Sequence, residues 1–455
     1  MNDWSILCWF CAGSLAVAGC ASYEPIPVPS KISMPQTASE ISVDRSQLPF
    51  ARLASHRFDP ADGFDMDEIA MLAVVNNPRL RNARDKLGIK HAQSFAAGLL
   101  PDPQLAMSFD HPTNGVAGNT DAFNINPSID VSAILLRSSR VDAATLKERQ
   151  VNLDLLWQEW QVVSQARLLF TRLHAHQQLL DQLQSAHQLL AALYQHSQRA
   201  LSAGNSTLDS VSANLASLQT IERQINDLER TRLKDRASLL KLLGFAQRAK
   251  LNLVGGPIAP HFDAAKVRAN LETRLATRPD MLALQAGYQS QEKKFRAAVL
   301  AQFPALNVGV SRARDNSGLY TLGFNLNLSL PIFSANRGNI AIERATRKML
   351  YDQYQERLNS GASEINIALT NLPLLETQLQ RIDSGISELQ TVADRAEKAL
   401  HAGNMTAPNY VRLRTTLLDK QKEAINLQEA LTEQQLALET LLGPDLPEQS
   451  GSNHS

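Results

Sequence analysis

Three cysteines, Cys8, Cys11 and Cys20, are the strongest nucleophiles in the chain, and all lie within its first twenty residues. A thiol can pair in a disulfide, bind a metal or accept an acyl group. Cys8 and Cys11 have the C-x-x-C spacing of redox motifs, but they fall inside an apolar stretch typical of an export signal. No cysteine follows Cys20, which excludes disulfides and cysteine-bound metals from the rest of the chain.

Four histidines on one expected helix are the other side chains with metal-binding chemistry: His174, His176, His187 and His196. A helix brings residues three or four apart onto one face, and no pair of these histidines has that spacing. We therefore expect solvated histidines and no metal site. The G-x-x-x-x-G-K-[ST], H-E-x-x-H and G-x-S-x-G motifs are also missing, so we expect no catalytic residue, no cofactor and no enzyme activity.

The apolar stretch at the start predicts export across a membrane. Residues 4–17 are too few to span a bilayer, and they lead into Val17-Ala18-Gly19-Cys20. Small residues before a cysteine resemble the lipobox of bacterial lipoproteins. The resemblance implies a signal peptide at residues 1–19 and acylation of Cys20, palmitate included. Met1-Asn2-Asp3 departs from the pattern because it carries no positive charge.

The sequence after Cys20 begins with a proline-rich segment, residues 20–62, which predicts a lipid anchor followed by an extended tether. Alanine at position 21 is compatible with transfer of such a lipoprotein to the outer membrane. Lysine plus arginine and aspartate plus glutamate number 45 each, so charge indicates no nucleic-acid partner.

The remainder of the chain is a duplication. Ala200-Leu201-Ser202-Ala203-Gly204-Asn205 recurs 199 residues later as Ala399-Leu400-His401-Ala402-Gly403-Asn404, and Leu242-Leu243-Gly244 recurs at the same interval as Leu441-Leu442-Gly443. One interval for both pairs predicts a repeated unit of about 200 residues. We assign the copies to residues 63–254 and 255–444, followed by a disordered tail at 445–455.

Each copy contains one expected β-hairpin, at about residues 104–132 and 305–331. Apolar and polar side chains alternate strictly from Tyr320 to Leu330, a length suited to a tilted strand crossing an outer membrane. A half-buried sheet would show the same alternation, but an isolated hairpin is unstable alone, so we expect pairing with other chains. Pro127 predicts a break or an edge in its strand.

Long helices follow each hairpin. Residues 141–201 contain neither proline nor glycine, which predicts an arm of about 90 Å, and residues 207–243 predict a return arm of about 55 Å. Leucines in the return arm have coiled-coil spacing. Gly204 and Gly403 are expected at the turns between arms. Pro373 lies inside the second long arm and predicts a kink or a split.

Each copy contains the same expected elements in the same order: helix, Xaa-Pro, helix, hairpin, long helix, Ala-Leu-x-Ala-Gly turn, long helix and Leu-Leu-Gly. This order resembles the outer membrane factor family, the TolC-like efflux ducts, over about residues 63–444. Supporting segments include Ala97-Gly98-Leu99-Leu100-Pro101-Asp102-Pro103, Gln302-Phe303-Pro304 and Leu330-Pro331-Ile332-Phe333. The lipobox and tether fit the lipoprotein branch.

The resemblance implies a mainly α fold with a small β part. It implies a homotrimer in the outer membrane, reaching into the periplasm, in which coiled-coil arms form an α-barrel and each chain adds four strands to a shared β-barrel. Such ducts conduct passively beside a periplasmic adaptor and an inner-membrane pump, and they export small molecules such as heavy-metal ions or drugs. The expected adaptor contacts are the turn residues Ala203, Gly204, Asn205, Ala402, Gly403 and Asn404.

The family often closes the tunnel mouth with carboxylates after the second turn, and this chain departs from that pattern. Pro408-Asn409-Tyr410-Val411-Arg412 contains no acid, whereas the first copy offers Asp209. The possible tunnel-mouth residues are therefore Asp209, Asn409 and Arg412, although Asp209 could instead be a solvated residue or a helix N-cap. Two other functions stay open: a non-conducting coiled-coil scaffold lipoprotein of the periplasm, and the exit duct of a protein-secretion system.

Overall fold

The computed structural model describes residues 22–37, 40–41, 43–113 and 118–444. The expected signal peptide, Cys20 and the tail at 445–455 lie outside these residues.

The first copy contains α3 (Met66–Asn76), α4 (Pro78–Gly98), β1 (Gln104–Asp110), β2 (Ala122–Asp130), α5 (Val131–Ser202) and α6 (Leu208–Leu242). The second contains α7 (Ala264–Ala269), α8 (Leu271–Thr277), α9 (Pro279–Leu300), β3 (Ala305–Arg314), β4 (Tyr320–Ser329), α10 (Arg337–His401) and α11 (Ala407–Leu442). The mainly α fold with a small β part is therefore confirmed.

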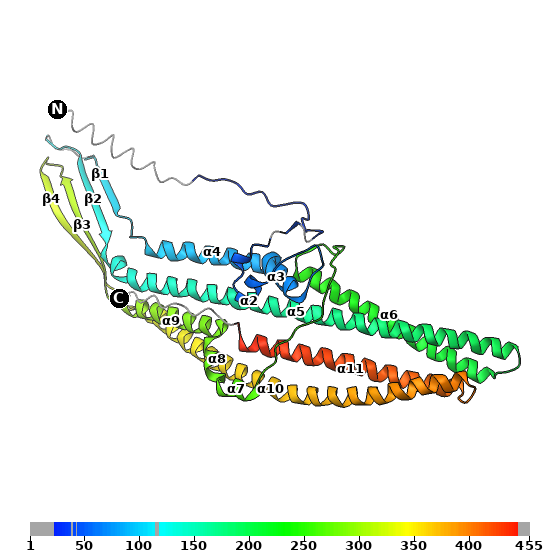
Figure 1. Cartoon of the computed structure of the whole chain (residues 1–455). Helices are drawn as coiled ribbons and strands as arrows, with labels where there is room; N and C mark the ends of the chain where they lie inside the picture. The colour runs from blue at the N-terminus through cyan, green and yellow to red at the C-terminus, as the bar shows by residue number, and fades with distance from the viewer. Residues whose placement is uncertain (1–21, 38–39, 42, 114–117, 445–455) are drawn as a thin grey trace. The chain divides into compact units, whose positions relative to one another are not determined.

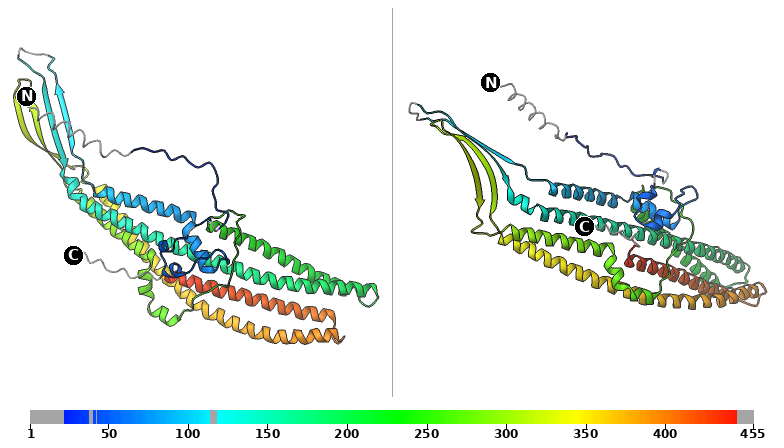
Figure 2. Two further views of the ribbon diagram at one scale, coloured as in Figure 1. Left: turned by 45° about the horizontal axis from the view of Figure 1, so that its top comes forward. Right: turned by 60° about the vertical axis from the view of Figure 1, so that its left-hand side comes forward.

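Within residues 35–444 the helices run between a sheet at one end and two helical turns at the other (Figure 1). The long helix α5 contacts α3, α4, α6, α9 and α11, so it is shared by both copies. Figure 2 shows the pairs α5–α6 and α10–α11 from two further directions. None of the helices in the described residues combines the length and the apolar character that crossing a bilayer requires.

The two hairpins pair with each other in the order β1-β2-β3-β4, all antiparallel. Each hairpin therefore finds one partner within its own chain, and β1 and β4 are left as the edges of the four-stranded sheet. Pro127 does interrupt the ladder: β2 pairs with β3 at Ile125 and resumes at Ser128. Proline has no N–H for the ladder, and Gly309, which is opposite Ser128, lets the backbone carbonyl of Pro127 approach closely.

The first long arm begins earlier than its sequence suggests. The helix α5 starts at Val131, directly after β2, because Asp130 Oδ1 accepts the backbone N–H of Ala133 at 3.0 Å and caps the helix. Pro373 does not split α10, which is continuous over 65 residues. The neighbouring Leu369 and Leu372 are buried in the core of the second copy, and their packing stabilises the helix around Pro373 despite the lost hydrogen bond.

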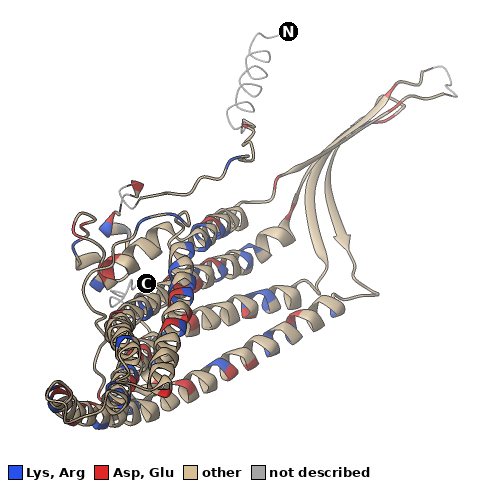
Figure 3. Ribbon diagram, turned by 90° about the vertical axis from the view of Figure 1, so that its right-hand side faces the viewer, with Lys and Arg blue, Asp and Glu red and all other residues tan. Residues whose placement is uncertain are grey.

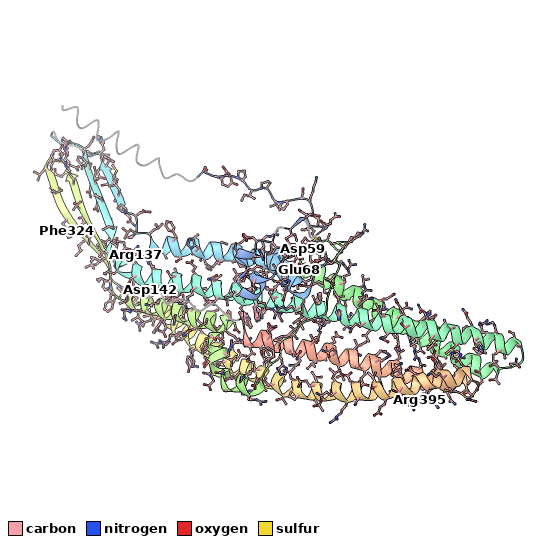
Figure 4. All side chains as sticks on the ribbon, viewed as in Figure 1. Asp59, Glu68, Arg137, Asp142, Phe324 and Arg395 are labelled. Atoms are coloured by element: carbon pink, nitrogen blue, oxygen red, sulfur yellow. The ribbon has the colours of Figure 1, made fainter. Side chains whose placement is uncertain are left out.

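The segment before the first repeat also differs from expectation. Residues 22–34 form a separate unit without helix or strand. From Pro35 onward the chain belongs to the main unit, where Phe50 is buried and its ring lies 5.1 Å from that of Trp160. The backbone N–H of Asp59 donates to Glu68 of α3 at 2.7 Å (Figure 4). The prediction of an extended tether up to residue 62 is therefore wrong for residues 35–62, because burial of aromatic side chains packs this segment against the helices.

A side chain just before a proline closes each repeat. Asn77 Nδ2 donates to the carbonyl of Leu242 at 2.8 Å, and Arg278 Nη1 donates to that of Leu441 at 2.9 Å. Both carbonyls belong to the last turn of a return helix, where backbone acceptors have no partner within the helix. Start and end of each repeat are thereby tied together.

Glycine is required more strictly at the end of the first return helix than at the arm turns. Gly244 has φ +71°, and a Cβ there would lie 2.7 Å from the carbonyl oxygen of Asn76; a Cβ at Gly204 would meet nothing within 4 Å. We expect Gly244→Ala to destabilise the protein by about 3 kcal/mol and Gly204→Ala by about 1 kcal/mol. Denaturant titration followed by circular dichroism measures both, and equal losses would contradict the structural difference.

Candidate functional site

The two arm turns, each containing three of the six expected adaptor contacts, have the same backbone geometry. Gly204 and Gly403 both have φ +74°, and the N–H of Asn205 and of Asn404 each donates at 2.8 Å to a carbonyl five residues back. All six predicted residues are exposed. Such hydrogen bonds close the helix ends and leave the turn side chains free to meet a partner.

The surfaces beside the turns differ. Leu208 follows the first turn and is 70% exposed, whereas Ala407 follows the second and is half-buried. Thr207 caps α6 through Oγ1, which accepts the N–H of Ser210 at 3.3 Å, whereas Thr406 makes no side-chain cap. One chain therefore presents two tips with the same backbone frame, and the first of them carries an exposed leucine.

The possible tunnel-mouth residues Asp209, Asn409 and Arg412 are all exposed, but they do not form one cluster within this chain. Asp209 lies in the first turn of α6, and the N-cap is Thr207, so the N-cap interpretation of Asp209 is wrong. Asn409 Oδ1 accepts a hydrogen bond from Arg412 Nη2 at 3.3 Å within α11. No hydrogen bond or ion pair in the described part of the chain joins Asp209 to that pair.

A shared apolar core holds the arms of the two copies together near the turns. It consists of Leu183 and Leu190 from α5, Leu218 and Ile221 from α6, and Val411 and Leu418 from α11. Of these residues, Leu218 belongs to the seam that the coiled-coil spacing predicts. The positions of the two turns therefore depend on one packed cluster.

Buried ion pairs form a second joint between the copies, one that the sequence did not reveal. Arg167 of α5 is 2% exposed and donates to Asp67 of α3 at 2.6 Å and to Glu439 of α11 at 3.2 Å. Burial alone would raise the pKa of Asp67, but Arg167 and Arg52 outweigh it and hold that pKa below its ordinary value. Single charges in a long helix give no sequence signal of such pairing.

A cluster rich in carboxylates lies where α5, α6 and α11 meet. Arg172 Nε donates to Glu433 Oε1 at 2.5 Å, and His176 Nδ1 lies 3.7 Å from Asp235 Oδ2. His176 is buried, so the expectation of solvated histidines is wrong for it. Burial, reinforced by the neighbouring Glu433, raises the pKa of Glu429 to about 7. In the described residues no group of three His, Cys, Asp or Glu could hold a metal ion.

The sheet has one apolar and one polar face, and much of the apolar face is exposed. Directly opposed residues share a face, so the pairings Val308–Leu326 and Val310–Phe324 lie on the apolar one. Phe324 is 68% exposed, and Figure 4 labels it on β4. The other face carries mainly Asn, Ser, Thr, Ala and Gly, including Asn325 opposite Gly309. Figure 3 shows the strands largely free of the charges that recur along the helices.

One end of the apolar face carries aromatic and basic side chains. The ring of Phe123 lies 6.3 Å from that of Tyr320, and the guanidinium of Arg314 lies 5.5 Å from the Tyr320 ring. Aromatic and amphipathic side chains at such a level are typical of a boundary between an apolar and an aqueous phase. The apolar face is thus suited to contact with an apolar phase that ends at the level of these aromatic and basic side chains.

Glu429 gives the arm cluster a defined pH dependence. A pKa raised in the folded state means that protonated Glu429 stabilises the fold below about pH 4.5, and that this contribution is lost as pH rises through about 7. We expect Glu429→Gln to exceed the wild type in unfolding free energy by about 1 kcal/mol at pH 8, after allowance for the partial exposure of the carboxyl. Thermal unfolding at pH 5 and pH 8 tests this, and a difference that is independent of pH would contradict it.

Comparison with known proteins bears on both the helices and the sheet. The family model described as outer membrane efflux protein matches residues 270–444. No curated protein matches the chain. The CmeC outer membrane channel of Campylobacter jejuni is 16% identical, with a TM-score of 0.73 over 95% of this chain and 96% of that one. The open-state MtrE outer membrane channel of Neisseria gonorrhoeae is 16% identical, with a TM-score of 0.69 over 95% and 99%.

A structure of CusC, described in connection with folding and transmembrane channel formation, is 18% identical, with a TM-score of 0.70 over 91% of this chain and 99% of that one. At such identities the structural likeness concerns the fold. The sequence match falls in the second copy, and the fold match extends over both. The second copy is therefore similar to the outer membrane efflux protein family, and the chain has the fold of outer membrane channels.

Proposed function

We propose that the protein is a passive, homotrimeric exit duct of the outer membrane, the last component of a tripartite efflux system. The observation that carries this proposal is the amphipathic four-stranded sheet, which continues directly into the long helix α5. An exposed apolar face in a water-soluble scaffold would be a liability, whereas in a bilayer it is the lipid contact. This observation favours a duct over a non-conducting scaffold lipoprotein.

Closure of the sheet requires further copies of the chain. The edge strands β1 and β4 have unpaired backbone groups on their outer sides, and such groups are costly in lipid. If β4 of one copy pairs with β1 of the next, three copies form a closed barrel with no free edge. The apolar face then meets lipid, and the Asn, Ser and Thr face lines water.

The helical arms extend the conduit into the periplasm. At 72 residues, α5 alone is about 110 Å long. The exposed turns at Gly204 and Gly403 then lie farthest from the membrane, where a periplasmic adaptor joined to an inner-membrane pump would bind. The cargo is a small molecule, a heavy-metal ion or a drug, chosen by the pump. Acylation of Cys20 would add a lipid anchor.

The two sheet faces predict opposite responses to a charge. Leu326→Arg places a cation on the apolar face and should cost about 2–4 kcal/mol of insertion energy, so the trimer and its conductance in planar bilayers should be lost. Asn327→Arg, on the neighbouring residue of the other face, should insert normally and change only ion selectivity. Conductance in neither the wild type nor Asn327→Arg would favour the scaffold alternative.

The turns predict a separable docking defect. Ala203→Asp and Ala402→Asp add a charge beside each turn glycine, where both side chains are exposed and support no packing. We expect normal heat-labile trimers, a loss of adaptor co-purification and impaired export in a deletion strain challenged with metals and drugs. Thr231→Asp, also exposed but on the α6 shaft, is the matched control. Unchanged export in both turn variants would exclude the turns from docking.

A further inference from the structure

A cavity of about 300 Å³ lies between α4, α5 and α9, away from the turns and the sheet faces. Its floor is a stripe of α5 that contains Ser139, Ala143 and Lys147, each four residues from the next. The small side chain of Ala143 leaves room above that floor, and α4 and α9 form the walls. Four cations line this cationic pocket, namely Lys90, Arg140, Lys147 and Lys294.

Tight helix packing holds the cations together. Ser290 Oγ of α9 donates to the carbonyl of Ala143 at 2.6 Å, and Gly287 lets Gln150 of α5 approach closely. Lys294 lies one turn beyond Ser290 on the same helix, so this contact fixes it over the α5 floor. The convergence of charge is therefore built by contacts between packed helices rather than by flexible surface loops.

No carboxylate neutralises the pocket. Within residues 43–113 and 118–444, no ion pair within 4.0 Å involves any of its four cations, and no acid lines it. The hydrogen-bond partners of the two inner ammonium groups are neutral amides: Lys90 donates to Gln93 at 2.8 Å, and Lys147 donates to Gln150 at 2.9 Å. Two nearby acids are engaged elsewhere, since Asp142 pairs with Lys293 and Glu148 with His91.

Like charges that lie close together repel one another, and in this pocket the repulsion is strongest at Lys147. Burial lowers the pKa of Lys147, and the ammonium groups of Lys294 and Lys90 lower it further, although Asp154 opposes them. A multivalent anion would reverse this repulsion by accepting hydrogen bonds from several ammonium groups at once. Phosphate matches that need, because it offers several charged oxygens.

We propose that the cationic pocket binds a phosphate-bearing anion, with Lys147 at its centre and the cations of the neighbouring helices around it. The anion is either a free phosphate or a lipid headgroup. Along α5 the pocket extends from about 12 Å to about 24 Å beyond the end of β2. It therefore lies on the helical side of the sheet, and the inference does not require the chain to conduct.

The test compares the full-length wild type with the triple variant Lys90→Gln, Lys147→Gln, Lys294→Gln. Inorganic phosphate is titrated by calorimetry at constant ionic strength, and retention of phosphatidylglycerol against phosphatidylcholine is measured by native mass spectrometry. We expect the triple variant to bind at least ten-fold more weakly to whichever probe the wild type prefers. Phosphate binding without lipid preference identifies the free anion, and a phosphatidylglycerol preference identifies the headgroup.

Two controls separate binding from folding. Arg296→Gln removes an exposed cation of α9 that does not line the pocket, and it should bind as the wild type does. Lys147→Arg should retain binding. Neither probe binding to the wild type, or equal affinity in the triple variant, would overturn the proposal. A triple variant that loses trimer stability while phosphate and lipid binding stay unchanged would also overturn it, because carboxylates of a second copy would then be the natural partners.

Discussion

One hydrogen bond, made by the side chain that precedes a proline, closes each repeat of this protein. In the first copy Asn77 caps the start of α4 with its carbonyl oxygen and the end of α6 with its amide nitrogen. In the second copy Arg278 reaches the equivalent carbonyl and also lies over the ring of Trp157 in α5. Because a buried helix end cannot leave its acceptors unpaired, this bond fixes where each return arm stops relative to where its repeat starts.

Each repeat, although closed by this hydrogen bond, still depends on the other repeat for its stability. Neither hairpin is a stable sheet alone, and neither helix pair buries all of its apolar surface. The copies are joined at three places: by the β2–β3 pairing before α5, by the ion pair of Arg167 with Glu439 midway along α5, and by the apolar cluster near the turns. The positions of the sheet and of the turns are thus coupled through one continuous helix.

Sequence patterns succeeded where the deciding interaction is local. Alternation located the strands, and the glycines at positive φ marked the arm turns, because both depend on the geometry of a few neighbouring residues. Sequence patterns failed where the conformation or burial of a residue depends on a contact with a distant part of the chain. Burial of His176 and the folding of Phe50 onto Trp160 both depend on residues far away in the chain.

The duplication, the order of helices and strands, and the two sheet faces follow from residue order alone, since periodicity and turn chemistry are short-range properties. The pairing of one hairpin with the other, the ion pairs around Arg167 and the gathering of four cations between three helices exist only in the folded chain. A single charge in a helix carries no mark of its partner, and only packing brings Lys90, Lys147 and Lys294 into one cavity. Tertiary structure decides such sites because charge interactions depend on distance through space, which the linear sequence does not encode.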